Sequence, residues 1–153
     1  MSEERKRVYV KTFSGFDVYV NGQTVYFPSA KAKEMLAVLV EKQGSSVSLA
    51  QMTYLLYEDS DEAKAKSTLR VIYLRLRRTL EEYGIENMVI KRRGSWAIAP
   101  DTFTCDFYEF ISGKSTYSTA YTGLYMPEYS WAANMLPYLD NLYWKHTSFA
   151  RKE

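Results

Sequence analysis

The segment from residue 63 to residue 98 constrains this chain most, because a basic amphipathic helix is followed there by a basic hairpin. The first part reads AKAKSTLRVIYLRLRRTLEEYG and the second reads MVIKRRGSWAI. The segment has a net charge of +6, whereas the whole chain of 153 residues has a formal net charge of +2. A basic helix and a basic loop of this kind can enter a DNA groove and contact the flanking phosphates. The nine basic residues are Lys64, Lys66, Arg70, Arg75, Arg77, Arg78, Lys91, Arg92 and Arg93.

A helical wheel of residues 63–83 predicts an apolar side and a polar side for this helix. The apolar sector contains Ala65, Leu69, Ile72, Tyr73, Leu76, Leu80 and Tyr83. The far side contains Ser67, Arg70, Leu74, Arg77 and Arg78, with Lys64 and Arg75 as its flanks. Gly84 is expected to end the helix. The segments 88–92 and 95–99 then predict a hairpin around Arg93-Gly94, closed by Pro100.

The sequence before this segment predicts a small sheet and two further helices. Alternating apolar and polar residues indicate strands at 8–13, 16–20 and 24–27, with Asn21-Gly22 as a hairpin turn. Ser29 can cap a helix over residues 30–43, which Gly44 would end. Ser48 and Gln51 form a capping-box pattern for a second helix, which reaches about Tyr57. The acidic linker 58–62 then lies at the positive end of the third helix.

The residue inventory excludes several classes of function. Cys105 is the only cysteine and His146 the only histidine, so we expect no metal site, no disulfide framework, no cofactor and no enzyme. Cys105 adjoins two phenylalanines and is expected to be packed. No run of eighteen apolar residues and no apolar signal-peptide core are present, which predicts a cytoplasmic chain that does not interact with a membrane.

The element order resembles the winged-helix effector domain of OmpR/PhoB-type response regulators, and most of all the variant found in SARP-like activators. The matching stretches are FSGFDVYVNGQTVYF, SAKAKEMLAVLVEKQG, LLYEDSDEAKAKSTLRV, LRVIYLRLRRTL and RRGSWAI. This resemblance covers about residues 8–104. It implies an α+β winged helix-turn-helix fold, with an N-terminal antiparallel sheet of three or four strands, three helices and a β-hairpin wing. A short α-helical extension would follow.

The resemblance also implies a role for each basic residue in sequence-specific binding of double-stranded DNA. The helix over residues 63–83 would be the recognition helix in the major groove, with Arg70 and Arg75 reading bases. Arg77, Arg78 and Ser67 would hold phosphates, while Arg92 and Arg93 would place the wing on the adjacent minor groove or backbone. The remaining candidates for the DNA-binding face are Lys64, Lys66 and Leu74. A homodimer on repeated half-sites and RNA polymerase are the partners that such a bacterial transcription regulator would have.

Residues 105–153 form a separate aromatic-rich extension in this prediction. The stretches CDFYEF and YTGLYMPEYSWA resemble the opening of a bacterial transcriptional activation domain. The segment is too short for a full helical array, so its helices should fold back, pair with another copy, or leave an apolar patch. Pro137 should kink or split its long helix. The candidate partner residues are Trp131, Leu136, Tyr138, Leu142 and Trp144.

Other interpretations compete with DNA binding. A protein-interaction or dimerisation module could use the same scaffold and the aromatic C-terminal surface. A basic helix face can also be plain solvated surface, and the tyrosines could stack on single-stranded bases. The coincidence of helix, wing and element order favours duplex DNA. No receiver domain precedes residue 8, so we expect a chain excised from a longer two-component regulator or a small regulator that stands alone.

Overall fold

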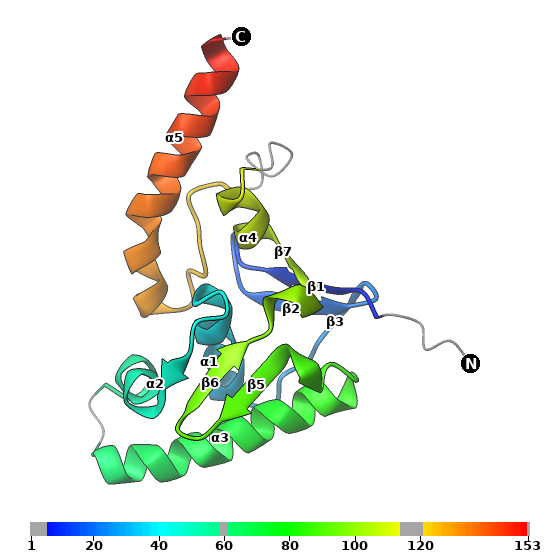
Figure 1. The fold of residues 1–153 in the computed structure, drawn as a ribbon, viewed down its shortest axis with the longest axis vertical. Coiled ribbons are helices and arrows are strands. Elements are labelled where there is room, and N and C mark those ends of the chain that lie inside the picture. The colour runs from blue at the N-terminus through cyan, green and yellow to red at the C-terminus, as the bar shows by residue number, and fades with distance from the viewer. Residues whose placement is uncertain (1–5, 59–60, 114–120, 153) are drawn as a thin grey trace. The chain divides into compact units, whose positions relative to one another are not determined.

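The computed structural model describes residues 6–58, 61–113 and 121–152, with backbone alone for residue 62 and residues 146–152. These residues form two compact units, shown in Figure 1. The helix–wing unit comprises residues 25–102, and the terminal unit combines residues up to 24 with those from 103 onward. The packing therefore groups the N-terminal strands with the C-terminal segment, whereas the sequence predicts one domain over residues 8–104.

The helix–wing unit contains the three predicted helices and the predicted hairpin. Its elements are α1 (Ala30–Glu41), β4 (Val47–Ser48), α2 (Leu49–Leu56), α3 (Glu62–Glu82), the 3-10 turns Glu86–Met88 and Pro100–Thr102, β5 (Val89–Arg92) and β6 (Ser95–Ile98). Ser29 caps α1 as predicted, and Ser48 and Gln51 form the predicted capping box of α2. The hairpin gains a third strand that the sequence analysis did not predict, because β4 pairs with β6 in the order β4-β6-β5.

The core of the helix–wing unit is built around α1. Met35, Leu36, Leu39 and Val40, whose spacing predicted this helix, have no exposed surface. The intervening Ala37 and Val38 are equally buried, so α1 is enclosed on most of its circumference. Such a helix fixes the positions of the elements packed around it, because protein cores are close-packed and resist displacement.

The terminal unit contains a four-stranded sheet in the order β3-β2-β1-β7. Its strands are β1 (Val8–Lys11), β2 (Asp17–Val20), β3 (Gln23–Thr24) and β7 (Thr104–Cys105). The predicted antiparallel sheet is correct for the first three strands, but β7 pairs with β1 in parallel. The third strand is also shorter than predicted. The chain leaves the sheet after Thr24, and the Tyr26 N–H donates to the hydroxyl of Tyr83 (3.1 Å) instead of to a strand.

The C-terminal part of the terminal unit holds α4 (Asp106–Ile111), a 3-10 helix (Ser130–Met135) and α5 (Leu136–Lys152). The predicted break at Pro137 is confirmed, because the 3-10 helix ends and α5 begins one residue before it. Proline is tolerated in the first turn of a helix, where its missing N–H would have no partner within the helix.

A buried carboxylate joins α4 to the end of β1. Asp106 is 3% exposed and accepts hydrogen bonds from Thr12 N–H (2.8 Å), Thr12 Oγ1 (2.7 Å), Phe13 N–H (3.0 Å) and Phe107 N–H (2.8 Å). Four donors on one carboxylate satisfy the backbone groups at the end of β1. This contact explains why the chain from residue 103 onward folds onto the N-terminal strands.

Candidate nucleic-acid interface

The ends of α3 are set by local sequence. Asp61 caps the N-terminus by accepting a hydrogen bond from the N–H of Ala63 (3.3 Å). At the other end Gly84 has a φ of +69°, a conformation that favours glycine. The N–H of Ile85 then reaches back to the carbonyl of Leu80 (2.9 Å), which completes a C-terminal cap of the Schellman type. The predicted stop at Gly84 is confirmed.

One side of α3 is buried and the rest faces outward. The buried stripe consists of Ala65, Leu69, Ile72, Leu76 and Leu80, each at most 4% exposed. All ten predicted DNA-binding residues are exposed, and so is Lys91. Those ten are Lys64, Lys66, Ser67, Arg70, Leu74, Arg75, Arg77, Arg78, Arg92 and Arg93. Nine basic side chains of α3 and the wing, together with Ser67 and Leu74, are thus accessible to a ligand. Among the described residues, only Arg77 of this set forms a hydrogen bond with a carboxylate.

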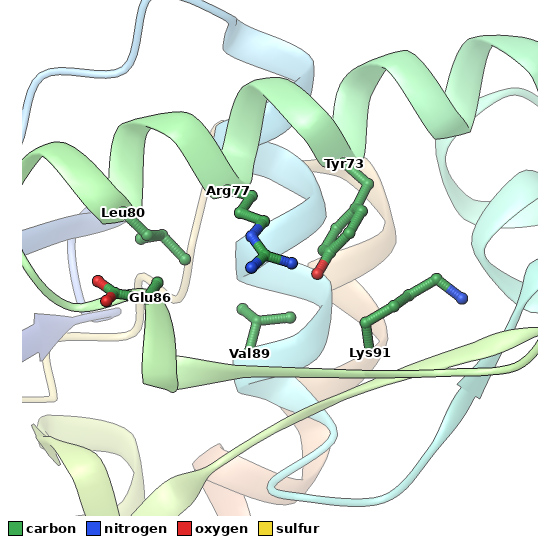
Figure 2. Close-up of a pocket in the computed structure, with 6 residues that line it drawn as sticks. All are labelled: Tyr73, Arg77, Leu80, Glu86, Val89 and Lys91. Carbon is green, nitrogen blue, oxygen red and sulfur yellow. The ribbon is translucent and has the colours of Figure 1, made fainter.

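Arg77 lies on the flank of α3 that faces the wing, not on the far side predicted for it. Figure 2 shows Tyr73 and Arg77 extending from α3 toward β5. With Leu80, Glu86, Val89 and Lys91 they line a cavity of about 190 Å³. Arg77 Nε donates to Glu81 Oε1 at 2.7 Å, and this bond, followed by the Tyr73 hydroxyl, raises the pKa of the guanidinium. The guanidinium of Arg77 therefore stays charged, while its Nε–H is already engaged in a hydrogen bond to Glu81.

Arg75 lies on the opposite flank of α3. It lines a second cavity of about 310 Å³ together with Arg78, Thr79 and Glu82 of the same helix and with Pro28 and Ser29 before α1. A separation of two residues corresponds to roughly 200° around a helix, which accounts for the opposite directions of Arg75 and Arg77. The outermost strip of α3 between these flanks contains Ser67, Arg70, Leu74 and Arg78, as the helical wheel predicts.

The wing is fixed to both α2 and α3. Its turn contains Gly94, whose φ of +74° permits the tight connection between β5 and β6. The carbonyl of Gly94 accepts from the N–H of Leu49 at the start of α2 (3.1 Å). On the other side the Trp96 ring contacts the Tyr73 ring of α3, with 6.0 Å between their centroids. These contacts hold the wing turn, which carries Arg92 and Arg93, against α2 and α3.

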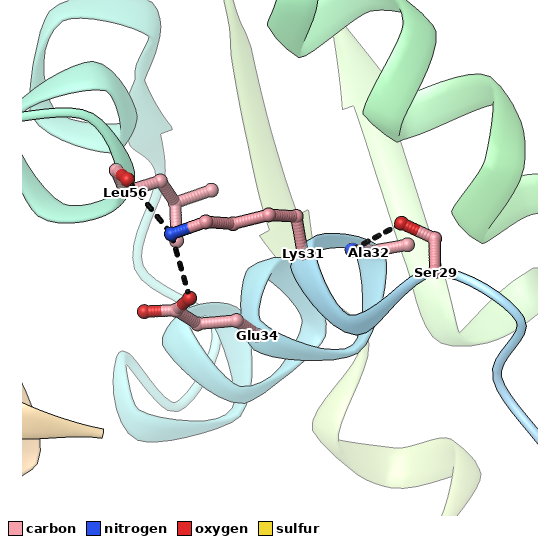
Figure 3. A network of polar contacts seen from close by, with 5 residues as sticks. All are labelled: Ser29, Lys31, Ala32, Glu34 and Leu56. Carbon is pink, nitrogen blue, oxygen red and sulfur yellow. Dashed lines mark hydrogen bonds and ion pairs between the residues drawn. The ribbon is translucent and has the colours of Figure 1, made fainter. Parts of the chain in front are cut away.

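A polar cluster connects α1 to the end of α2, as Figure 3 shows. Lys31 Nζ donates to the carbonyl of Leu56 (3.0 Å) and to Glu34 Oε1 (3.1 Å). The same ammonium lies 5.0 Å from the centre of the Tyr57 ring. The ammonium of Lys31 is thus engaged by groups at the C-terminal end of α2. We therefore do not count Lys31 among the basic side chains of the candidate interface.

The predicted partner residues at the C-terminus divide into two groups. Trp131 is only 8% exposed and stacks on Tyr129 with 5.3 Å between ring centroids, so its inclusion in a surface patch was wrong. Tyr138 and Trp144 on α5 are 51% and 64% exposed, and Leu136 and Leu142 are half-buried. Trp131 precedes the break before α5, which is why its side chain does not continue the exposed face of that helix.

The described part of the chain contains no group of three or more His, Cys, Asp or Glu side chains arranged to hold a metal ion. Cys105 is buried, and burial raises the pKa of its thiol, as expected for a packed cysteine. The side chain of His146 lies outside the described residues. None of the described helices is long and apolar enough to span a membrane.

Comparisons with known proteins support the fold. No protein-family model and no curated protein matches the chain. Among solved structures the chain is similar to Mycobacterium tuberculosis EmbR, determined in complex with a low-affinity phosphopeptide, with a TM-score of 0.72 and 17% sequence identity. The similarity covers 89% of this chain and 42% of the EmbR chain. The shared α+β fold is compatible with the winged helix predicted from the sequence.

Proposed function

We propose that this chain binds double-stranded DNA sequence-specifically as the effector domain of a bacterial transcription regulator of the SARP-like type. The recognition helix α3 enters the major groove, and Arg92 and Arg93 place the wing on the adjacent minor groove or backbone. The DNA-binding domain corresponds to residues 8–104, with residues 105–153 as its extension. The regulator works in the cytoplasm, as a homodimer on repeated half-sites that can contact RNA polymerase.

The observation that carries this proposal is the exposure of all nine basic side chains of α3 and the wing within one compact unit. A duplex carries one negative charge per roughly 1.7 Å of its axis, so a surface of this kind gains affinity by releasing counterions. The exposed face of α3 also presents side chains that can reach base edges, which phosphate contacts alone cannot read. The fold likeness to EmbR, a regulator of the SARP type, supports the same kind of protein.

The test begins with selection of bound duplexes from a randomised DNA pool. Binding of the recovered duplex is then measured by fluorescence anisotropy over a series of salt concentrations. We expect the pair Arg75→Ala/Arg77→Ala to weaken binding and to lower the slope of log K against log salt by at most about 1.8, the value for two phosphate contacts at about 0.9 each. The matched control is Lys42→Ala/Lys145→Ala, which removes two exposed cations outside α3 and the wing.

The control pair should leave the slope unchanged. If the Arg75/Arg77 pair and the control pair behave alike, the assignment of α3 as the DNA-binding element is wrong. If the randomised pool yields no common sequence, binding is not sequence-specific and the proposed function fails.

A second candidate is a protein-interaction or dimerisation module. The observation that favours it is the exposure of Tyr138 and Trp144 on one helix, α5. Light scattering of the full chain and of Tyr138→Ser/Trp144→Ser tests this candidate. Truncation at residue 105 is unsuitable because it deletes Asp106, on which the end of β1 depends. A dimer that dissociates in the variant supports the module, and a monomeric parent chain excludes dimerisation through this face.

A further inference from the structure

Two large apolar side chains are exposed on the basic side of α3. Val71 is 46% exposed and Leu74 is 54% exposed. Val71 lies two residues after the buried Leu69, and Leu74 lies two residues before the buried Leu76, so each projects roughly 200° away from the core stripe. The buried stripe is complete without them. Packing among the described residues therefore gives no reason for an apolar residue at either position.

The neighbours of Val71 and Leu74 are polar or cationic along the helix. Residues four apart are adjacent on a helix surface. One row therefore consists of Ser67, Val71 and Arg75, and the next consists of Arg70, Leu74 and Arg78. All six side chains of the two rows are exposed. Each apolar residue thus has a polar residue one turn before it and an arginine one turn after it.

The charge around this apolar pair decides which occupant it fits. A second copy docking through the same face would bring two basic surfaces together, because the segment that contains α3 and the wing carries a net charge of +6. Such an approach is repulsive. Double-stranded DNA brings phosphates that complement the surrounding arginines and lysines. In its major groove, the apolar group that distinguishes one base pair from another is the C5-methyl of thymine.

We propose that Val71 and Leu74 read thymine methyl groups in the major groove, a role that rests on the proposed function of α3. Three helical residues correspond to a rise of about 4.5 Å, close to the 3.4 Å step between stacked base pairs. The side chains of Val71 and Leu74 can therefore contact thymines of the same base-pair step or of neighbouring base-pair steps. Arg70 and Arg78, one turn away on either side of Leu74, are positioned to contact the flanking bases or phosphates.

The experiment replaces individual thymines by uracil in the selected duplex. This change removes the C5-methyl and leaves the hydrogen-bonding groups of the base unchanged. Removal of one buried methyl contact should weaken binding by about fourfold. We expect this loss at one or two thymines of the half-site for the parent protein. At those thymines the loss should disappear in Val71→Ala or Leu74→Ala, because the contact is already absent in the variant.

Leu124→Ala is the matched control, since Leu124 is an exposed leucine (51%) in the terminal unit. It should keep the sensitivity of the parent protein to uracil. Both α3 positions are exposed, so the variants should fold normally. Circular dichroism and light scattering are the measurements that check for an unchanged fold and mass.

Two results would overturn the inference while leaving the proposed function intact. The first is tight, selective binding of the parent protein with no uracil effect at any thymine. The second is a change of oligomeric mass in Leu74→Ala, which would assign the apolar pair to a contact between copies. Loss of all selective DNA binding by the parent protein would instead reject the proposed function, and the inference with it.

Discussion

The rings of Tyr73 on α3 and Trp96 on β6 lie 6.0 Å apart between centroids, with their planes tilted by 48°. Lys91 Nζ lies 5.1 Å from the centre of the same tryptophan ring. Helix α3 and the wing therefore share an aromatic contact, and Trp96 itself is 3% exposed. Its Nε1 has no hydrogen-bond partner among the described residues. The indole acts here through its size and shape, not through its N–H.

This contact predicts different effects for two substitutions of Trp96. Trp96→Ala should lower the free energy of unfolding by roughly 3–5 kcal/mol, because a cavity replaces a large buried ring. Trp96→Phe should cost less than Trp96→Ala, since an aromatic ring is kept, the cavity is smaller and no hydrogen bond is lost. Urea denaturation measures both values. Equal losses in the two variants would show that a phenyl ring at this position does not maintain the contact between α3 and the wing.

The helices were predictable from the sequence because their signals are local. Ser29, Ser48 with Gln51, and Gly84 mark helix ends through groups within a few residues, and all of them act as predicted. The positions of β4 and β7 were not predictable. Each strand has only two residues, too few to show an alternating pattern. Each forms only by pairing with a strand distant in sequence, β4 with β6 and β7 with β1. Tertiary pairing therefore determined what the sequence pattern could not.

The candidate interface was predictable in its composition but only partly in its geometry. A helical wheel correctly placed Arg70, Leu74 and Arg78 on the outer strip. It could not show that Arg77 extends toward β5, because that depends on where the wing packs. Val71 was not among the predicted site residues, although its place on the same helical wheel, outside the apolar sector, indicates an exposed position.

The cap of α2 should affect both stability and DNA binding. Ser48 Oγ accepts from the N–H of Gln51 (3.1 Å), and the Ser48 N–H donates to Gln51 Oε1 (2.8 Å). Ser48→Ala should therefore lower the free energy of unfolding by about 1 kcal/mol. Because Ser48 also pairs with Ser95 in β6, the variant should weaken DNA binding through the wing. The exposed Ser46→Ala serves as control and should change stability by less than about 0.5 kcal/mol.

Asp106 should make stability depend on pH in a particular direction. Burial raises the pKa of its carboxyl above the ordinary value, and the hydrogen bonds from Phe13, Thr12 and Phe107 offset part of the rise. The folded state therefore holds this proton to a higher pH than the unfolded state does. The stabilisation from this proton is complete below the unfolded pKa of about 3.9 and is lost as the pH rises through the folded pKa.

Asp106→Asn does not titrate, so it isolates this effect. The unfolding free energy of the parent protein minus that of the variant should decrease as the pH rises above about 3.9 and then level off. Urea denaturation over a pH series measures the difference. The exposed Asp101→Asn is the control. A difference that grows with pH would mean that the hydrogen bonds outweigh burial and that the carboxyl pKa is lowered.

Glu81 should weaken DNA binding by occupying Arg77. Arg77 and Glu81 form an ion pair with an Nε–Oε1 distance of 2.7 Å. Their side chains are 57% and 49% exposed, respectively. An ion pair this exposed contributes little to folding, so Glu81→Gln should leave the urea midpoint nearly unchanged. The same change removes a negative charge from the proposed DNA-binding face and frees Arg77 for a phosphate. Affinity for the selected duplex should rise, and the slope of log K against log salt should steepen by up to about 0.9.

The control for this prediction is Glu109→Gln on α4 of the terminal unit, which changes the net charge by the same amount without altering the helix–wing unit. Binding of this control should match that of the parent protein at each salt concentration. If Glu81→Gln raises affinity without steepening the slope, Arg77 makes no new phosphate contact, and Glu81 acts only through long-range repulsion of the DNA. If Arg77→Ala and Arg77→Ala/Glu81→Gln then bind equally, Glu81 affects binding through Arg77 alone, as the 2.7 Å contact implies.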